Sequence, residues 1–211
     1  MAGKERKLPL PDTAVRERLL EVAAKLFPRK GYAATTTREI VAAAGVTKPV
    51  LYYYFRSKEG IYLELMQRAF KQFENVVDTS IMGSGSIEQK ILRLCDQVFD
   101  LALKEIEVVR LVYAFYYGPP QGAPFFDFDA VNQRLFEAIQ QLVMEGMRKK
   151  ELREGKVEDM VWAIFGAVNI TIENELCHPE RELGHAGLRR ILRLLFQGIS
   201  TARGRRKGEK R

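Results

Sequence analysis

The chain has 211 residues, of which 46% are hydrophobic and 29% are charged, so its bulk should fold as one large or two small globular domains. Its two cysteines are too few for a disulfide framework, and we expect both to be small buried thiols in a reducing compartment. The sequence after Met1 carries no apolar signal, and residues 161–172 form an apolar run shorter than the ~20 residues of a membrane span. We therefore expect a cytoplasmic protein with no membrane contact.

The net charge of +7 is unevenly distributed along the chain. Residues 1–7 and 203–211 carry +2 and +5, and we expect both tails to be disordered. Residues 8–58 hold nine basic and four acidic side chains (+5), whereas residues 59–202 hold sixteen and twenty-one (−5). A basic N-terminal segment on an acidic body directs that segment towards phosphate, which indicates a nucleic-acid partner.

Helical spacing recurs along the chain, and alternating strand patterns are missing. A first helix presents one apolar face and ends at Gly31; the face comprises Val15, Leu19, Val22, Ala23, Leu26 and Phe27. Thr36 and Glu39 have the spacing of a capping box, which predicts the start of a second helix. Gly45 suits the left-handed residue after its end. Thr47 is expected to cap a third helix, with Pro49 in the first turn, and a fourth helix opens at Lys58.

The rest of the chain also reads as helices separated by breaks. We expect helices over residues 58–82, 87–101, 106–117, 125–150, 157–177 and 188–199, with a forced break at 118–124. The prediction is an all-α protein of about nine helices. Residues 8–58 form an N-terminal three-helix helix-turn-helix DNA-binding domain, whose core extends into the start of the helix at 58–80. Residues 59–202 form a second helical domain.

Three segments resemble the DNA-binding domain of the TetR family of bacterial repressors: Gly31-Tyr-Ala-Ala-Thr-Thr-Thr-Arg-Glu-Ile, Ala44-Gly-Val-Thr-Lys and Leu51-Tyr-Tyr-Tyr-Phe-Arg-Ser-Lys-Glu. The similarity covers about the first quarter to third of the chain. It implies a ligand-responsive repressor that binds a palindromic operator as a homodimer. It also implies that the later helices hold a small-molecule pocket and the dimer interface.

A helix-turn-helix lays its second helix in the major groove, with the first turn against base edges. Lys48 can then bond guanine and Val50 can contact a thymine methyl. Hydroxyls beside the groove suit phosphate oxygens, and Lys58 resembles the phosphate-contacting lysine of the family. The expected DNA-binding residues are Thr36, Thr37, Thr47, Lys48, Pro49, Val50, Tyr52, Tyr53 and Lys58. As alternatives, the threonines serve only as caps and the tyrosines as core.

Two further groups of side chains follow from the later helices. Aromatic walls with a few polar groups suit a largely apolar effector, and the expected pocket residues are Arg110, Tyr113, Tyr116, Tyr117, Phe128, Trp162, Phe165, Asn169 and Glu173. The last two helices are apolar on two sides, which indicates cover by a partner subunit. The expected dimer interface comprises Val161, Val168, Ile172, Leu188, Ile191, Leu192, Leu195 and Ile199. As alternatives, the aromatic residues are plain core, and both helices are fully buried within one subunit.

Catalysis finds little support in the sequence. His178, His185 and Cys177 lack the spacing of a zinc site, and no nucleophile or phosphate-binding motif occurs. We therefore expect no catalytic residue, no metal and no cofactor. Two alternatives remain at this stage: a DNA-organising protein of the same fold that ignores effectors, and a helical enzyme that binds a lipid or aromatic molecule.

Overall fold

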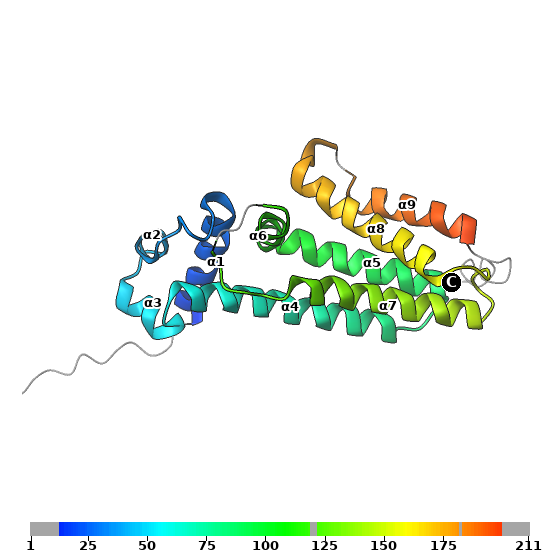
Figure 1. Ribbon diagram of the computed structural model, residues 1–211, viewed down its shortest axis with the longest axis horizontal. Helices are drawn as coiled ribbons and strands as arrows, with labels where there is room; N and C mark the ends of the chain where they lie inside the picture. Colours follow the sequence, from blue (N-terminus) through cyan, green and yellow to red (C-terminus); the bar gives the residue numbers. More distant parts are fainter. Residues whose placement is uncertain (1–12, 119–121, 182, 200–211) are drawn as a thin grey trace, which may run out of the picture. The chain divides into compact units, whose positions relative to one another are not determined.

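The computed structural model describes residues 13–118, 122–181 and 183–199 (Figure 1). Within these ranges the regular elements are nine α-helices and one short 3-10 helix, which confirms the all-α prediction. No helix in the described ranges is long and apolar enough to cross a bilayer. Both predicted tails, residues 1–7 and 203–211, lie outside the described residues.

The helices follow one another along the chain. They are α1 (Thr13–Lys30), α2 (Thr37–Ala43), α3 (Lys48–Phe55), α4 (Lys58–Met82), α5 (Ile87–Lys104), α6 (Ile106–Tyr117), α7 (Phe128–Arg148), α8 (Val157–Cys177), the 3-10 helix η1 (Pro179–Arg181) and α9 (Gly184–Ile199). The bounds of α6 and α8 are those predicted from the sequence.

Two helix starts differ from the prediction for identifiable reasons. Helix α7 begins three residues later than expected because the Asp127 side chain accepts a hydrogen bond from the Ala130 amide and caps the helix. Helix α9 begins four residues earlier than expected, at Gly184. Its first turn contains two glycines, which disfavour helix, but the Gly184 amide donates to the Glu175 carboxylate at 2.9 Å. Tertiary contacts therefore outweigh local propensity there.

The chain divides into two compact units. Unit 1 contains the residues up to Met66 together with Leu111–Phe126, and unit 2 contains Gln67–Arg110 together with the residues from Asp127 onward. The sequence-based boundary at 58/59 therefore differs from this division, because the first two turns of α4 and the second half of α6 pack with the N-terminal helices. Helices α4 and α6 each contribute residues to both units.

An aromatic cluster forms the centre of unit 1. The Tyr62 ring of α4 lies 6.1 Å from Phe27 of α1, 5.3 Å from Tyr32 and 5.4 Å from Phe115 of α6. These separations suit edge-to-face ring packing, which adds to the free energy gained by burial. Burial raises the pKa of the Tyr62 phenol to about 12, with a smaller contribution from Tyr32. The cluster joins α1, α4 and the end of α6 around one core.

The core of unit 2 lies between α5, α7, α8 and α9, which run alongside one another (Figure 1). Its fully buried side chains include Leu94, Phe99, Ile139, Val161, Val168, Leu188 and Leu192. Cys95 is buried there, as expected, but Cys177 at the end of α8 is exposed, so the prediction of two buried thiols was wrong for Cys177. The apolar pattern of α8 ends before Cys177, at the buried Leu176.

A buried carboxylate links two helices of unit 2. Glu151, which follows α7 and is almost fully buried, accepts a hydrogen bond at 2.9 Å from the amide of Ile87, the first residue of α5. That amide has no partner inside its own helix, because the first amides of every helix lack one. Glu151 therefore satisfies a buried donor that would otherwise be orphaned.

We expect Glu151→Ala to lower the free energy of unfolding by about 1–3 kcal/mol, because it leaves the buried Ile87 amide without an acceptor. Urea denaturation followed by circular dichroism measures this loss. The exposed Glu154 provides a matched control, and Glu154→Ala should change stability by less than about 0.5 kcal/mol. Equal losses for both variants would show that the Glu151–Ile87 bond does not stabilise the fold.

Candidate nucleic-acid interface

Helices α2 and α3 are joined by a turn whose geometry the sequence encodes. Thr36 and Glu39 form the predicted capping box at the start of α2. At its end the Val46 amide donates to Val41 O and the Gly45 amide to Ala42 O, with Gly45 at φ 63°. This pair of bonds is the Schellman arrangement, which requires a residue that tolerates the left-handed region. Backbone hydrogen bonds thus hold the turn between the two helices.

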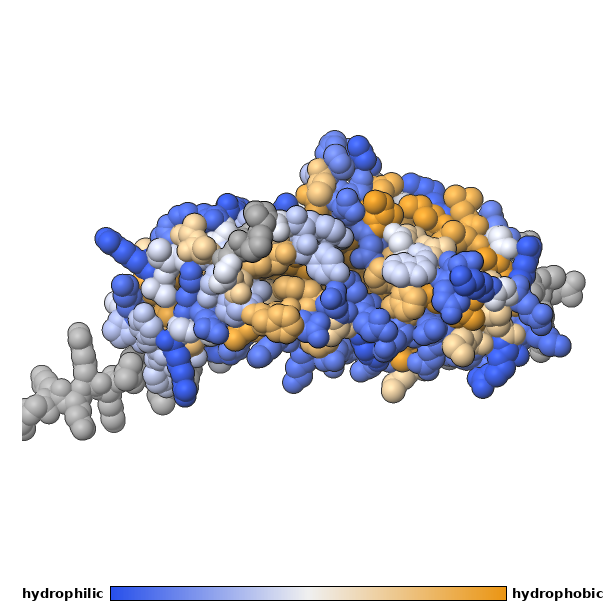
Figure 2. Space-filling model, in the orientation of Figure 1, coloured by the Kyte–Doolittle hydropathy of each residue, from blue (hydrophilic) through white to orange (hydrophobic). Residues whose placement is uncertain are grey.

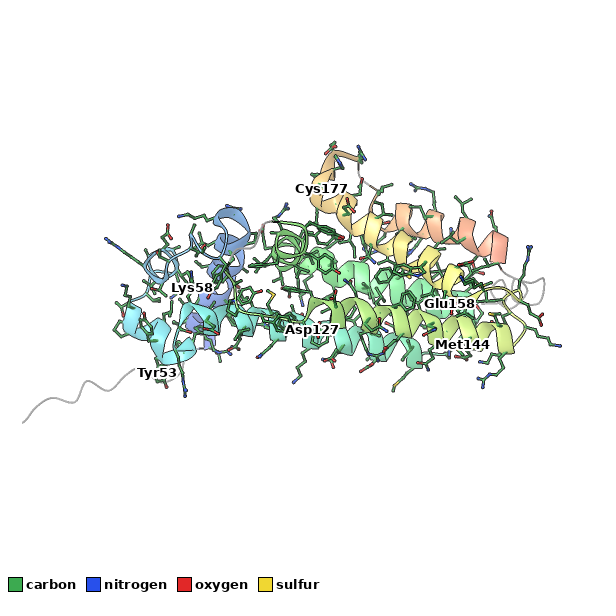
Figure 3. The ribbon with its side chains drawn as sticks, in the orientation of Figure 1. Tyr53, Lys58, Asp127, Met144, Glu158 and Cys177 are labelled. Carbon is green, nitrogen blue, oxygen red and sulfur yellow. The ribbon has the colours of Figure 1, made fainter. Side chains whose placement is uncertain are left out.

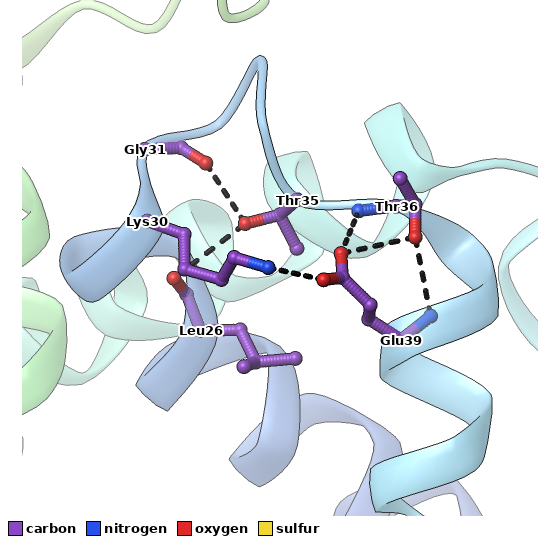
Figure 4. Close-up of polar contacts among 6 residues, drawn as sticks. All are labelled: Leu26, Lys30, Gly31, Thr35, Thr36 and Glu39. Carbon is purple, nitrogen blue, oxygen red and sulfur yellow. Dashed lines mark hydrogen bonds and ion pairs between the residues drawn. The ribbon is translucent and has the colours of Figure 1, made fainter.

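The Glu39 carboxylate lies at the centre of a polar network between α1 and α2 (Figure 4). It accepts from the Lys30 ammonium and from the amide and hydroxyl of Thr36, at 2.9 and 3.0 Å for the Thr36 donors. The Lys30 hydrogen bond is the main reason that the pKa of Glu39 falls to about 2, and the two Thr36 bonds lower it further. Glu39 therefore stays ionised at neutral pH and joins the end of α1 to the start of α2.

Helix α3 buries one side and exposes the other. Leu51 and Phe55, four residues apart, are buried in unit 1. The exposed side carries Thr47, Lys48, Pro49, Tyr52 and Tyr53, and Val50 is half-buried beside them. The Tyr53 side chain lies at the edge of this unit (Figure 3). The residues expected to meet DNA in α3 are therefore on its solvent-facing side.

The start of α3 differs from the expected cap. Thr47 occupies the N-cap position, but its side chain makes no capping hydrogen bond, so the predicted capping role was wrong in that respect. Pro49 sits in the first turn, as expected. Its fixed φ and its missing amide hydrogen suit that position, so the turn forms without help from the Thr47 hydroxyl.

The remaining expected DNA-binding residues lie in or near α2 and α4. Thr36 is exposed and Thr37 is half-buried at the start of α2. Lys58, the first residue of α4, is half-buried, and its ammonium donates to the backbone oxygen of Tyr32 at 2.8 Å (Figure 3). Loss of hydration lowers the pKa of Lys58. Lys58 thus differs from Lys48, which is exposed to solvent.

The nine expected pocket residues are divided between the two units. Tyr113, Tyr116 and Tyr117 belong to unit 1, and Tyr117 is 77% exposed. In unit 2, Trp162 and Phe165 of α8 pack edge-on against Phe136 of α7 and line a surface groove of about 400 Å³ with Asp129, Asn132 and Gln133. Phe136 was not among the pocket residues expected from the sequence, and it lies one residue after the buried Leu135 of α7.

The other expected pocket residues of unit 2 either donate hydrogen bonds to backbone oxygens or are partly or fully exposed. Asn169 donates its amide to Phe165 O at 2.9 Å, and Arg110 donates to Leu176 O at 3.4 Å. Phe128 is half-buried and Glu173 is exposed. The structure therefore brings together only Trp162 and Phe165 of the predicted set in one described groove.

The expected dimer residues lie mostly inside the subunit. Val161, Val168, Ile172, Leu188 and Leu192 are buried in the core of unit 2, while Ile191, Leu195 and Ile199 are half-buried. Val161, Val168, Leu188 and Leu192 have no exposed surface within the subunit, and Ile172 keeps 8%, so the dimer assignment of these five residues stays a prediction. The large hydrophobic residues exposed on these helices are Trp162 and Ile170 of α8 and Leu194 of α9.

The imidazole rings of both histidines lie close to carboxylates. His178 lies 3.2 Å from Glu180, and His185 lies 2.9 Å from Asp100 and 3.5 Å from Asp96. Among the described residues, no group of three or more His, Cys, Asp or Glu side chains is arranged to hold a metal ion.

The low pKa of Glu39 predicts an acid-sensitive link between α1 and α2. The stabilisation it provides is fully present above the ordinary carboxyl pKa of 4.5 and is lost as pH falls from there towards about 2. We expect Glu39→Gln to lower stability at pH 7 and to reduce its decline between pH 5 and 3, measured by urea denaturation. Glu21→Gln on the exposed side of α1 is the control. Parallel pH profiles for wild type and Glu39→Gln would contradict this assignment.

Comparison with known proteins identifies the family of the chain. Residues 19–65 match the model of the bacterial regulatory proteins of the tetR family. The chain is 33% identical over 159 residues to the transcriptional repressor KstR2 of Mycolicibacterium smegmatis, which covers 73% of this chain and 75% of KstR2. It is 32% identical over 111 residues to the transcriptional activator FasR of the same species, which covers 53% of this chain.

The matches vary in extent. The chain spans about half of FasR and of the regulator YttP of Bacillus subtilis, and 66% of the regulator YdgC of Bacillus subtilis. Among solved structures, the regulator FadR of Bacillus subtilis in complex with stearoyl-CoA has the same fold, with a TM-score of 0.67, 20% identity, and coverage of 87% of this chain and 99% of FadR. These relatives are named as regulators and not as enzymes. From its motif and from the match to KstR2 along most of both proteins, the chain belongs to the TetR family of bacterial regulatory proteins.

Proposed function

We propose that this protein is a transcriptional repressor that binds a palindromic DNA operator as a homodimer and is released by a small, largely apolar effector. The observation that carries the proposal is the exposed side of α3. A lysine, two tyrosines and a threonine lie on this side, and two buried residues on the opposite side anchor the helix. Repression rather than activation is favoured by KstR2, a repressor that matches more of the chain than the activator FasR does.

The exposed residues of α3 differ in the part of DNA that each is suited to contact. Lys48 lies in the first turn, where a helix-turn-helix meets base edges, and its ammonium suits guanine O6 and N7. Val50 suits a thymine methyl group. The exposed hydroxyls of Thr47, Tyr52 and Tyr53 suit phosphate oxygens, which fix register without reading sequence. We assign Thr36 and Thr37 at the start of α2 to a neighbouring phosphate.

The dimer contact is assigned to the exposed side of α8 and α9. Figure 2 shows apolar side chains gathered over these helices. Ile170 and Leu194 are exposed, and an added Cβ at Gly166 or Gly198 would meet no atom of the same chain. Small residues beside large apolar ones allow the helices of a second copy to approach closely. This side supports a four-helix contact between α8 and α9 of two subunits, which presents two α3 helices to two matching half-sites.

The effector is assigned to the aromatic side chains of α7 and α8. The rings of Phe136, Trp162 and Phe165 lie 5.1–6.1 Å apart around a groove of about 400 Å³, and such walls bind apolar molecules. FadR was solved with stearoyl-CoA, a molecule with a long apolar chain. An effector that binds better to the DNA-free dimer lowers the operator affinity by the same factor, because coupling between two sites is reciprocal.

Lys48→Ala tests the division of roles in α3. We expect it to weaken binding to the cognate operator and to relax preference at one base position by about 1–3 kcal/mol. Mobility shift on palindromic and random DNA, at fixed salt, measures both effects. Equal losses on the two DNAs would contradict base reading by Lys48, and no binding of the wild type to any palindromic DNA would contradict the proposed function.

Ile170→Glu tests the dimer contact. Ile170 is 55% exposed on α8, and a glutamate there would place an unpaired carboxylate in the proposed apolar interface, so we expect monomers that keep their helix content. Met144 of α7 is also 55% exposed, so Met144→Glu is a matched control that should stay dimeric (Figure 3). Sedimentation equilibrium measures the mass of each. A dimeric Ile170→Glu protein would place the interface elsewhere.

A further inference from the structure

A polar groove of about 450 Å³ lies between α5 and α9 in unit 2, and we call it the α5–α9 groove. Helix α5 supplies two glutamines, two aspartates and an arginine to its walls, and α9 supplies two more arginines. The groove therefore holds three guanidinium groups against two carboxylates, although residues 59–202 together carry a charge of −5. Leu92 is the only apolar side chain among the described lining residues, so the groove does not suit an apolar ligand.

The amide oxygens of both glutamines are already occupied by donors of the same chain. Gln89 Oε1 accepts from the Ser86 amide at 3.0 Å, and Gln97 Oε1 accepts from the Ser80 hydroxyl. Because a glutamine side chain has one acceptor oxygen and one NH₂ group, these bonds leave the two NH₂ groups to donate. The glutamines therefore offer donors to a ligand in the α5–α9 groove.

The two aspartates of the groove lie against basic side chains of α9. Asp96 Oδ2 accepts from Arg189 Nε at 2.8 Å, and Asp96 Oδ1 lies 3.5 Å from His185 Nδ1. Asp100 Oδ1 lies 2.9 Å from Nε2 of the same imidazole. The Arg189 guanidinium offsets the charge of Asp96, and its bond to Asp96 uses Nε alone, so its two NH₂ groups are not consumed by that bond.

The other two arginines have donors without an acceptor. Arg93 donates Nη2 to Ser84 O at 2.8 Å, and its guanidinium packs over Gly83, where an added Cβ would lie 2.8 Å from the guanidinium carbon. Its Nε is buried and meets no acceptor among the described residues, and a buried donor without an acceptor is costly. Arg193 is exposed, and no other described residue pairs with it. The groove thus combines unused donors with occupied acceptors.

We propose that the α5–α9 groove binds the phosphate group of a small phosphorylated molecule. Guanidinium groups bind phosphate oxygens through paired, charge-assisted hydrogen bonds. A phosphate group offers three acceptor oxygens, which suits donors that converge from two helices better than the two oxygens of a carboxylate do. Small-molecule sites have volumes of about 300–1,000 Å³, so a groove of this size also has room for the rest of the ligand.

This site goes beyond the proposed function, because it lies apart from the surfaces assigned there to DNA, effector and partner subunit. Arg189 and Arg193, four residues apart, share one side of α9. Leu194 and Gly198, which we assign to the dimer contact, share the neighbouring side. The effector groove is formed by α7 and α8 instead.

Calorimetric titration of the whole chain tests the site, with inorganic phosphate and ribose 5-phosphate as probes and ribose as the uncharged control. We expect both phosphates to bind and ribose not to bind. Arg193→Gln should weaken phosphate binding by about tenfold or more, because it removes a charged donor. Arg190→Gln removes the same charge from an exposed residue of α9 outside the groove and should keep the affinity of the wild type. Absence of phosphate binding by the wild type, or equal losses in the two variants, would overturn the proposal.

Nuclear magnetic resonance of isotope-labelled arginine locates the bound phosphate. We expect inorganic phosphate to shift the Nε–Hε signal of Arg93, whose buried donor gains an acceptor, and to leave that of Arg190 unchanged. An unchanged Arg93 signal in phosphate-bound protein would contradict the assignment.

Vesicles of phosphatidylglycerol separate a lipid headgroup from a soluble ligand. We expect no sedimentation of the protein with these vesicles that depends on Arg193. Vesicle binding that Arg193→Gln abolishes, without binding of the soluble phosphates, would overturn the proposal in favour of a lipid surface. These measurements contain no DNA, so a failure to bind operator would sink the proposed function and leave this test intact.

Discussion

The candidate DNA-binding surface depends on the burial of Leu51 and Phe55. Helix α3 has only eight residues, and a helix of that length is not stable alone in water. Its geometry therefore comes from these two side chains, each of which contributes about 1.5–3 kcal/mol when fully buried. Because they lie four residues apart, they occupy one side of the helix, and the other side is left without a packing role. That division allows the exposed residues of α3 to vary without loss of the fold.

Local signals in the sequence were sufficient for the helix-turn-helix. The Thr36–Glu39 spacing and Gly45 specify backbone bonds within a few residues of themselves, and the structure contains those bonds. The same local reasoning placed the ends of α6 and α8 correctly. It failed at the start of α9, where the Gly184 amide is held by Glu175, nine residues earlier. The hydrophobic periodicity of a helix does not reveal a hydrogen bond from its first residue to a carboxylate outside the helix, so this helix start could not be predicted.

The sequence also did not show which apolar side of α8 faces the core. Periodicity identified two sides, one with Val161 and Val168 and the other with Trp162 and Ile170, but hydrophobicity does not distinguish core from interface when both are apolar. The structure places the side with Val161 and Val168 in the core and leaves Trp162 and Ile170 exposed. The aromatic groove raised the same difficulty, because it needs Phe136 from α7 beside Trp162, and their proximity is a property of helix packing alone.

The Glu39 network resolves an electrostatic conflict at the candidate surface. A carboxylate beside the first turn of α2 favours the helix dipole but would repel an approaching phosphate. The Lys30 ammonium pairs with Glu39, so the positive charge offsets the negative charge of the carboxylate. The carboxylate still accepts hydrogen bonds from both Thr36 donors. Arg38 and Lys48 are exposed to solvent, and surface charges act over about 8–10 Å at physiological salt. The acidic cap thus stabilises the motif without cancelling its attraction for DNA.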